Sequence, residues 1–199
     1  MSVATPYFDQ LFAGNDDPWA FRQRWYEQRK RALTLAMLTR PRYASIFEPG
    51  SANGELSAEL APRCERLLCC DTATAAVRLA QARLECFPHA RVEQRRLPEQ
   101  WPGGQFELIL LSELCYYLDA GDFNRLIDCA LAALTADGQI LACHWRVPID
   151  GCPQTAEQVH AVLQQRLGVA PLVQYQDPDF LLNLWSLDGT SVARHEGLR

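Results

Sequence analysis

The sequence predicts a doubly wound α/β fold, in which helices cover both faces of a mostly parallel sheet. Segments typical of strands and helices alternate from residue 43 to residue 167, which implies parallel strands joined by right-handed helical crossovers. Apolar runs such as Leu108–Leu111 are continuous, as expected of strands that are covered on both faces. The last two predicted strands have no helix between them and should form an antiparallel hairpin at the sheet edge.

The expected elements follow from apolar periodicity and from helix-start and helix-stop residues. Asp16-Asp17-Pro18 begins a long amphipathic helix over residues 16–39, which ends before Pro41. Thr72 is expected to cap a later helix. Strands are expected at 44–47, 66–70, 91–95, 106–111, 138–145, 172–176 and 180–187, and further helices at 53–60, 72–84, 122–134 and 155–167. These segments predict a three-layer, Rossmann-like arrangement with seven strands.

The length of the chain, 199 residues, is typical of one domain. The sequence contains no internal repeat, no low-complexity tract and no long linker. We therefore expect a single domain over residues 1–199. It should consist of an N-terminal helical cap at 1–40 and a Rossmann-like core at 43–199.

Charge and cysteine spacing narrow the functional classes. The net charge of −5 disfavours a nucleic-acid or membrane partner, and the basic residues within 22–31 are expected to form a solvated helix face. The eight cysteines form no C-x-x-C pair, so zinc or thioredoxin-like chemistry has no support, and no metal site is expected. The sequence shows neither a signal peptide nor an apolar stretch of about 20 residues, so a cytoplasmic location is the expectation.

A glycine-containing loop follows the first predicted strand, in the segment Glu48-Pro49-Gly50-Ser51-Ala52-Asn53-Gly54-Glu55. Glycines allow a backbone to turn sharply and to approach a ligand closely. A dinucleotide fingerprint would require glycine at positions 50, 52 and 55, with a pyrophosphate at the helix N-terminus. Ala52 and Glu55 depart from that pattern, and the Glu48 carboxylate would repel a diphosphate. The loop therefore disfavours a nicotinamide cofactor.

The same loop suits S-adenosylmethionine, which carries no phosphate. Glu48 would lie near the ammonium of its methionine end, and the loop N–H groups would be free to approach its carboxylate and ribose. Asp71 ends the second predicted strand, about 20 residues after the loop, where an acid can accept hydrogen bonds from both ribose hydroxyls. NAD would use such an acid as well, so Asp71 alone does not separate the two cofactors.

The loop resembles motif I of class I methyltransferases, with Ala52 in place of the middle glycine. More closely, the chain resembles the nodulation protein S family of N-methyltransferases. The shared segments are Asp17-Pro18-Trp19, Trp25-Tyr26-Glu27, the glycine loop, Asp71, Phe106–Leu111 with Ser112-Glu113-Leu114-Cys115-Tyr116-Tyr117-Leu118, and His144-Trp145-Arg146. The resemblance covers nearly the whole chain, and it implies an enzyme that uses S-adenosylmethionine.

The resemblance also implies which residues bind the cofactor. Those expected at the methionine moiety are Glu48, Gly50, Ser51, Ala52 and Gly54. Asp71 is expected at the ribose. Thr72, Arg96 and Leu97 are expected at the adenine. Ser112, Glu113 and Leu114 are expected near the transferred methyl group. The superfamily usually places an acid after the third strand, whereas the first acid here is Glu99. Trp25 and Arg29 should cover the cofactor, with Arg29 reaching its carboxylate; the alternative for Trp25 is core packing.

Candidates for the catalytic base are Glu113, His144 and His160. A methyl acceptor must present an unprotonated nitrogen, so a nearby base or a desolvated pocket assists transfer. Residues expected to bind the acceptor are Tyr116, Tyr117, Arg146 and Asp150. For the two tyrosines, core packing after a strand is the alternative.

The expected reaction is methyl transfer to a small-molecule acceptor. The resemblance favours the nitrogen of an amino sugar or small amine. Three alternatives stay open at this point: methylation of a hydroxyl or carboxyl group, a nicotinamide-dependent oxidoreductase, and a cofactor-binding protein without activity. Either a monomer or a homodimer is compatible with the sequence.

Overall fold

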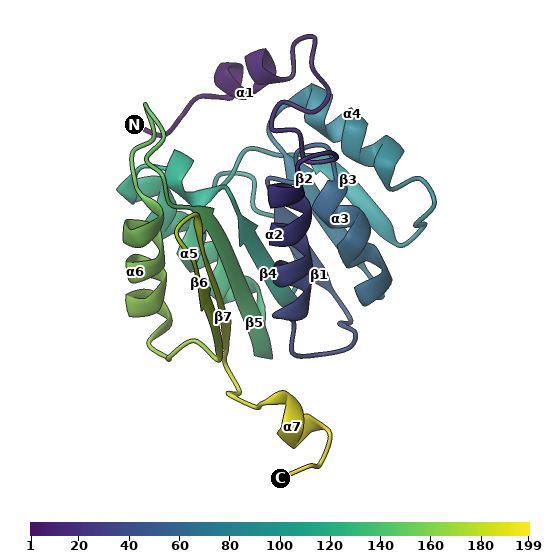
Figure 1. Cartoon of the computed structure of the whole chain (residues 1–199), viewed down its shortest axis with the longest axis vertical. Coiled ribbons are helices and arrows are strands. Elements are labelled where there is room, and N and C mark those ends of the chain that lie inside the picture. The colour runs from purple at the N-terminus through teal and green to yellow at the C-terminus, as the bar shows by residue number, and fades with distance from the viewer.

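A seven-stranded sheet forms the middle layer of the computed structural model, which describes residues 1–199 (Figure 1). The strand order is β3-β2-β1-β4-β5-β7-β6. Strands β1 to β5 are parallel, and β7 is antiparallel to both β5 and β6. The strands are β1 (Ile46–Pro49), β2 (Leu67–Asp71), β3 (Ala90–Gln94), β4 (Phe106–Ser112), β5 (Leu134–Trp145), β6 (Val173–Gln176) and β7 (Phe180–Ser186). The predicted doubly wound sheet with its antiparallel C-terminal hairpin is confirmed.

Helices cover both faces of this sheet (Figure 1). One face packs against α5 (Ala120–Ala133) and α6 (Ala156–Leu167), and the other against α2 (Trp25–Ala36), α3 (Glu55–Leu60) and α4 (Thr74–Arg83). Two short 3-10 turns, η1 (Ala61–Arg63) and η2 (Cys115–Tyr117), follow α3 and β4. The terminal helices are α1 (Thr5–Leu11) and α7 (Val192–His195). No helix in the chain combines the length and apolar character that crossing a bilayer requires.

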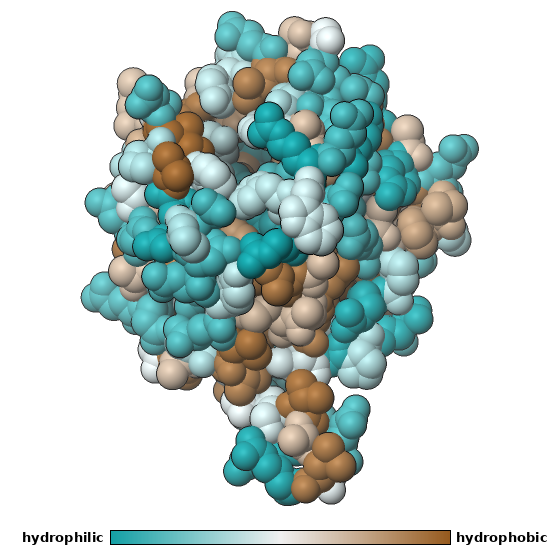
Figure 2. Space-filling view, in the orientation of Figure 1, coloured by the Kyte–Doolittle hydropathy of each residue, from teal (hydrophilic) through white to brown (hydrophobic).

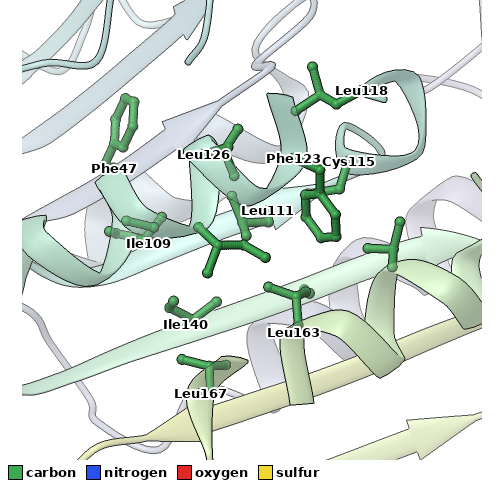
Figure 3. Close-up of a cluster of buried hydrophobic side chains, with 14 of the residues drawn as sticks. Phe47, Ile109, Leu111, Cys115, Leu118, Phe123, Leu126, Ile140, Leu163 and Leu167 are labelled. Atoms are coloured by element: carbon green, nitrogen blue, oxygen red, sulfur yellow. The ribbon is translucent and has the colours of Figure 1, made fainter. Parts of the chain in front are cut away.

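Strand β4 divides its side chains between two hydrophobic cores. Ile109 and Leu111 join the cluster beneath α5 and α6, where they meet Leu126 and Leu163 (Figure 3). Leu108 and Leu110 point the other way and join the cluster beneath α2 and α3. All four are fully buried, and burying a leucine or isoleucine contributes about 1.5–3 kcal/mol each. This double burial explains the continuous apolar run in the sequence.

The opening helix is shorter than expected, because residues 16–24 form turns and α2 begins at Trp25. The Asp17 carboxylate accepts hydrogen bonds from the backbone N–H groups of Phe21 and Arg22, at 2.8 and 3.1 Å. Such local side-chain bonds compete with helical ones. The expectation of a solvated basic face is wrong in part, since Lys30 and Arg31 are buried.

Other boundaries shift for local reasons. Thr72 does not cap α4: Ala73 occupies that position, and the Thr72 hydroxyl bonds to that of Thr5 at 2.8 Å. Helix α5 begins earlier than expected because the Asp119 side chain accepts the Asp122 N–H. Strand β5 begins at Leu134 instead of 138, beside a register shift in β4.

Two elements have no counterpart in the sequence prediction. Helix α1 lies above the carboxyl ends of the strands (Figure 1). The segment before α1 is joined to η2 by a hydrogen bond of 2.8 Å from the Val3 N–H to the Tyr117 carbonyl. Helix α7 projects from the end of the β7 segment, and apolar residues are visible on this projection in Figure 2. Val192 and Leu198 are its exposed apolar side chains.

Candidate functional site

Three neighbouring cavities lie at the carboxyl ends of β1, β2 and β4, where open parallel sheets bind ligands. The β2 cavity, of about 110 Å³, is lined among others by Gly50, Asp71, Thr72, Arg96, Leu97, Glu113, Leu114, Phe8 and Trp19. The β1 cavity, of about 60 Å³, is lined among others by Glu27, Lys30, Arg31, Glu48, Gly50, Ser51, Ser112 and Glu113. The aromatic cavity, of about 420 Å³, is lined among others by Trp19, Phe21, Tyr26, Glu27, Lys30, Glu113, Tyr116, Tyr117 and Trp145. Glu113 borders all three.

The glycine loop is held in shape by its own backbone hydrogen bonds. Gly50 and Ser51 donate to the Cys70 carbonyl at 2.7 and 3.0 Å, and Gly54 donates to the Ser51 carbonyl. The Ala52 N–H donates to the Asp71 carboxylate at 3.0 Å. The expectation that the loop N–H groups are free for a ligand is therefore wrong for these four residues.

Positive φ angles in the loop explain its residue types. Gly50 and Gly54 lie at φ +74° and +81°, and Ala52 reaches φ +47° despite its side chain. A Cβ at Gly54 would lie 2.9 Å from the Ala80 Cα of α4, so this glycine allows α3 and α4 to pack closely. A Cβ at Gly50 would lie 3.4 Å from Leu114 at the edge of the β2 cavity. Gly54 thus has a packing role, whereas Gly50 lines the site itself.

Asp71 stands at the boundary between the loop and the β2 cavity. Its two carboxylate oxygens each accept one backbone N–H, from Ala52 at 3.0 Å and from Ala73 at 2.9 Å. Burial raises the pKa of Asp71, and these backbone hydrogen bonds oppose that rise. Each carboxylate oxygen keeps a second lone pair, so the group can still accept from a pair of ligand hydroxyls.

Glu48 is a buried carboxylate without a cationic partner in the protein. Its side chain is 2% exposed, and the Cys69 thiol donates a weak hydrogen bond to it at 3.4 Å. Burial raises the pKa of Glu48 to about 7. A buried carboxylate is costly unless it is paired, so a ligand ammonium in the β1 cavity would supply the missing charge. The chemistry of this cavity fits the amino-acid end of S-adenosylmethionine.

Glu113 is held by three donors from three different elements. The Lys30 ammonium of α2 lies 2.7 Å from its Oε1, while the Tyr116 hydroxyl at 2.5 Å and the Trp145 N–H at 2.9 Å both donate to Oε2. Glu113 also adopts a φ of +52°, a conformation that costs energy for a non-glycine residue. Its own N–H donates to the Cys143 carbonyl at 2.8 Å, which fixes this backbone at the end of β4.

The two histidines form a buried pair that borders none of the three cavities. His144 is fully buried; the Cys115 N–H donates to its Nε2 at 3.2 Å, and its Nδ1 lies 3.1 Å from His160 Nε2. Accepting at Nε2 places the proton of neutral His144 on Nδ1, from which it is donated to His160. Burial lowers the pKa of both histidines, that of His160 to about 4. The pair connects η2 to β5 and α6.

Four further sequence candidates lie away from the cavities. Trp25 is 72% exposed, so it neither packs in the core nor lines a cavity. Arg29 pairs with Asp177 at 2.9 Å and with the Tyr175 hydroxyl. Arg146 donates to Glu157 at 2.8 Å and to the Asp177 carbonyl at 2.6 Å, while Asp150 is exposed. Glu99, the first acid after β3, pairs with Arg125 and lines none of the three cavities, whereas Asp122 borders the β2 cavity.

Several lining residues were missed by the sequence analysis. These are Glu27, Lys30 and Arg31 of α2, Trp19 and Phe21 of the turns before it, and Ser2, Val3, Thr5 and Phe8 of the N-terminal segment. The Asp17-Pro18-Trp19 and Trp25-Tyr26-Glu27 segments were singled out in the sequence, but without a role for Trp19 or Glu27. For the N-terminal segment the sequence carries no signal of its own.

Comparison with known proteins identifies the family of this chain. The family model described as "Nodulation protein S (NodS)" matches residues 10–173. The chain belongs to the nodulation protein S family. The nodulation protein S of Bradyrhizobium diazoefficiens is 30% identical over 128 residues, and that of Rhizobium tropici is 27% identical over 128 residues. Each match covers 63% of this chain, but only 61% and 54% of the relatives, so the aligned part is less than two thirds of their length.

Solved structures agree with this nodulation protein S assignment. The N-methyltransferase NodS of Bradyrhizobium japonicum WM9, in complex with S-adenosyl-L-homocysteine, matches with a TM-score of 0.80 and 25% identity, over 92% of this chain and 97% of that one. A Pseudomonas syringae protein, provisionally named a methyltransferase, matches with a TM-score of 0.74 and 64% identity, over 82% of this chain and 99% of that one. The expected family resemblance is confirmed.

Proposed function

We propose that this nodulation protein S relative is an S-adenosylmethionine-dependent methyltransferase that acts on the nitrogen of a small amine or amino sugar. The observation that carries the proposal is the meeting of three cavities at Glu113. Two of them suit a nucleoside and an amino acid, and the third has room for an acceptor. The complex of a NodS N-methyltransferase with S-adenosyl-L-homocysteine supports the same reading.

Residues of the β1 and β2 cavities would hold the cofactor. The Glu48 carboxylate binds the ammonium, and Asp71 accepts from the ribose hydroxyls. Two buried cations line the β1 cavity: Lys30, which pairs with Glu27 and Glu113, and Arg31, which pairs with Glu59. They would attract the cofactor carboxylate, a role that the family resemblance implied for Arg29. Thr72 and Leu97 border the space for adenine. S-adenosylmethionine, when bound, supplies a methyl group on a positively charged sulfur.

The acceptor would enter the aromatic cavity. Seven aromatic residues line its walls, namely Tyr7, Trp19, Phe21, Tyr26, Tyr116, Tyr117 and Trp145. Aromatic faces attract cationic amines and also stack on the apolar faces of sugar rings. Glu27, Lys30 and Glu113 bring charge to the same cavity. An amine seated there lies beside the two cofactor cavities, and holding the reactants close and in line lowers the barrier to methyl transfer.

Two measurements test this proposal. Calorimetry should show S-adenosylhomocysteine binding in the micromolar range and no comparable binding of NAD. Transfer of a labelled methyl group should then be measured with glucosamine, ethanolamine, benzylamine and their hydroxyl analogues. Incorporation into the amines supports N-methylation, whereas incorporation only into the hydroxyl analogues would favour O-methylation. Binding of NAD in place of S-adenosylhomocysteine would refute the proposal.

A further inference from the structure

Glu27 is the buried carboxylate that lies between the cofactor side and the acceptor side of the site. It stands in the first turn of α2, is 7% exposed, and lines both the β1 cavity and the aromatic cavity. A buried glutamate in an acceptor cavity needs an explanation, because burying a charge without full pairing is costly. The hydrogen bonds of Glu27 are therefore informative.

The side chain of Glu27 is far less engaged than that of Glu113. Its one polar partner is the Lys30 ammonium, 3.1 Å from Oε2 and 3.3 Å from Oε1. The same ammonium lies closer to Glu113, at 2.7 Å, and Glu113 also accepts from Tyr116 and from the Trp145 N–H. Both lone pairs of Glu113 Oε2 are thus occupied, whereas Glu27 keeps lone pairs available in the cavity.

We propose that Glu27 is the residue that accepts the proton of the methyl acceptor, while Glu113 is the fixed anion around which the site is built. This inference rests on the proposed function. The bound acceptor ammonium passes one proton to a carboxylate oxygen of Glu27, and the freed lone pair of the amine forms the new N–C bond. The S–C bond breaks, and its electron pair stays on sulfur. The product leaves as a methylated ammonium ion, and Glu27 returns its proton to solvent.

Electrostatics agree with this division of roles. Burial raises the pKa of Glu27, with Lys30 opposing the rise, and a catalytic base is most effective when its pKa lies near the working pH. Proton transfer to Glu113 would instead disrupt its ion pair with Lys30 and its bonds from Tyr116 and Trp145. Protonating Glu27 therefore costs less free energy than protonating Glu113.

The test compares Glu27→Gln, Glu27→Asp and a control, with the amine that the wild-type chain methylates fastest among glucosamine, ethanolamine and benzylamine. Glutamine can still accept from Lys30 but is not a base. We expect Glu27→Gln to lower kcat at neutral pH by about 10²-fold, within the range for a positioned base. S-adenosylhomocysteine affinity is measured in parallel, which separates an effect on cofactor binding through Lys30 from the loss of a proton acceptor. Activity should recover at high pH, where the amine is already neutral.

The conservative and control variants complete the test. Glu27→Asp keeps a carboxylate and should retain the wild-type shape of the kcat–pH profile at a lower plateau. Glu107→Gln removes a part-buried carboxylate near Arg40, at the opposite end of β4, and should leave the profile unchanged. A Glu27→Gln enzyme with wild-type kcat and pH profile would overturn the inference. No methylation of any amine by the wild-type chain would instead overturn the proposed function.

Discussion

The Ala52 N–H donates a hydrogen bond of 3.0 Å to the Asp71 carboxylate, which ties the loop after β1 to the end of β2. The same carboxylate also accepts the Ala73 N–H ahead of α4. One acidic side chain therefore shapes two segments of the β2 cavity besides any contact with ribose. Substitution of Asp71 should reveal both of these contributions.

Asp71→Ala should weaken the binding of S-adenosylhomocysteine by about 1–3 kcal/mol, because the hydroxyl groups of the ribose and the loop N–H lose their acceptor. Calorimetry measures this change. The melting temperature should also fall, since the buried N–H groups of Ala52 and Ala73 are left without a partner. Asp128→Ala, which removes an exposed carboxylate from α5, is the control. Unchanged affinity in Asp71→Ala would remove this residue from the cofactor site.

The raised pKa of Glu48 makes both stability and ligand binding depend on pH. Its carboxyl has an ordinary pKa of 4.5 and a folded value of about 7, so the folded state holds the proton more tightly than the unfolded state. The contribution of Glu48 to the free energy of unfolding is complete below about pH 4.5 and is lost as the pH rises towards 7. The total change in this free energy is about 3 kcal/mol. Glu48→Gln should flatten this part of the urea-unfolding profile. Ligand affinity of the wild type should rise over the same pH window, as the carboxylate ionises.

Glu113→Gln should reduce turnover while affecting cofactor affinity little. The amide cannot neutralise Lys30, so the cation loses its closest carboxylate and the site loses its fixed geometry. We expect kcat to fall by at least about tenfold, which corresponds to about 1.4 kcal/mol in the barrier. Tyr116→Phe removes a single hydrogen bond to the same group and should have a smaller effect. Normal kcat in Glu113→Gln would show that the anion is dispensable.

The buried histidine pair should make the fold sensitive to acid without affecting the pH profile of catalysis. The lowered pKa of His160, about 4, means that the folded state resists protonation. Stability is therefore lost as pH falls below the ordinary value of 6.5, by about 2 kcal/mol at pH 5. His160→Gln should reduce this loss in urea unfolding, whereas the exposed His195→Gln should not. A changed kcat–pH profile in His160→Gln would restore this residue as a candidate base.

Gly54 and Gly14 allow steric crowding to be separated from backbone strain. Both have φ +81°, but a Cβ at Gly54 would lie 2.9 Å from Ala80 Cα, while nothing lies within 4 Å of one at Gly14. Gly14→Ala should cost about 1–2 kcal/mol of unfolding free energy for its left-handed conformation. Gly54→Ala should cost about 1–3 kcal/mol more, because of overpacking. Equal losses in the two variants would show that α3 and α4 can separate freely.

The site residues that the sequence could predict are those at the carboxyl ends of strands. Glu48 and Asp71 each follow an apolar strand, and the carboxyl ends of parallel strands lie at one edge of a sheet. Their positions were therefore fixed by the alternation of strands and helices. Ser112, Glu113 and Leu114, at the end of β4, were implied by the family resemblance. The C-terminal hairpin was predicted because no helix separates the last two strands.

Contributions from helices and from the N-terminal segment could not be predicted in this way. Arg29, Lys30 and Arg31 are consecutive on α2, and only the packed helix shows that Arg29 faces Asp177 while the next two face the β1 cavity. The apolar pattern that predicts a helix also predicts that its charged residues face solvent. Lys30 is instead buried between Glu27 and Glu113, so this pattern could not reveal its position. His144 was expected to be a candidate base in the acceptor pocket, but its side chain pairs with His160 of α6.

Side chains alternate between the two cores from Leu108 to Leu111, beyond the register shift that separates Leu108 from Phe106. Deleting one residue from this stretch would rotate every following side chain by half a turn, so the isoleucine and leucine positions would change sides. Both sides are apolar, so hydrophobicity alone would tolerate the exchange. The strand would nevertheless deliver Glu113 on the wrong side of the sheet, away from Lys30. Insertions and deletions should therefore be rarer in this strand than changes of one aliphatic side chain for another.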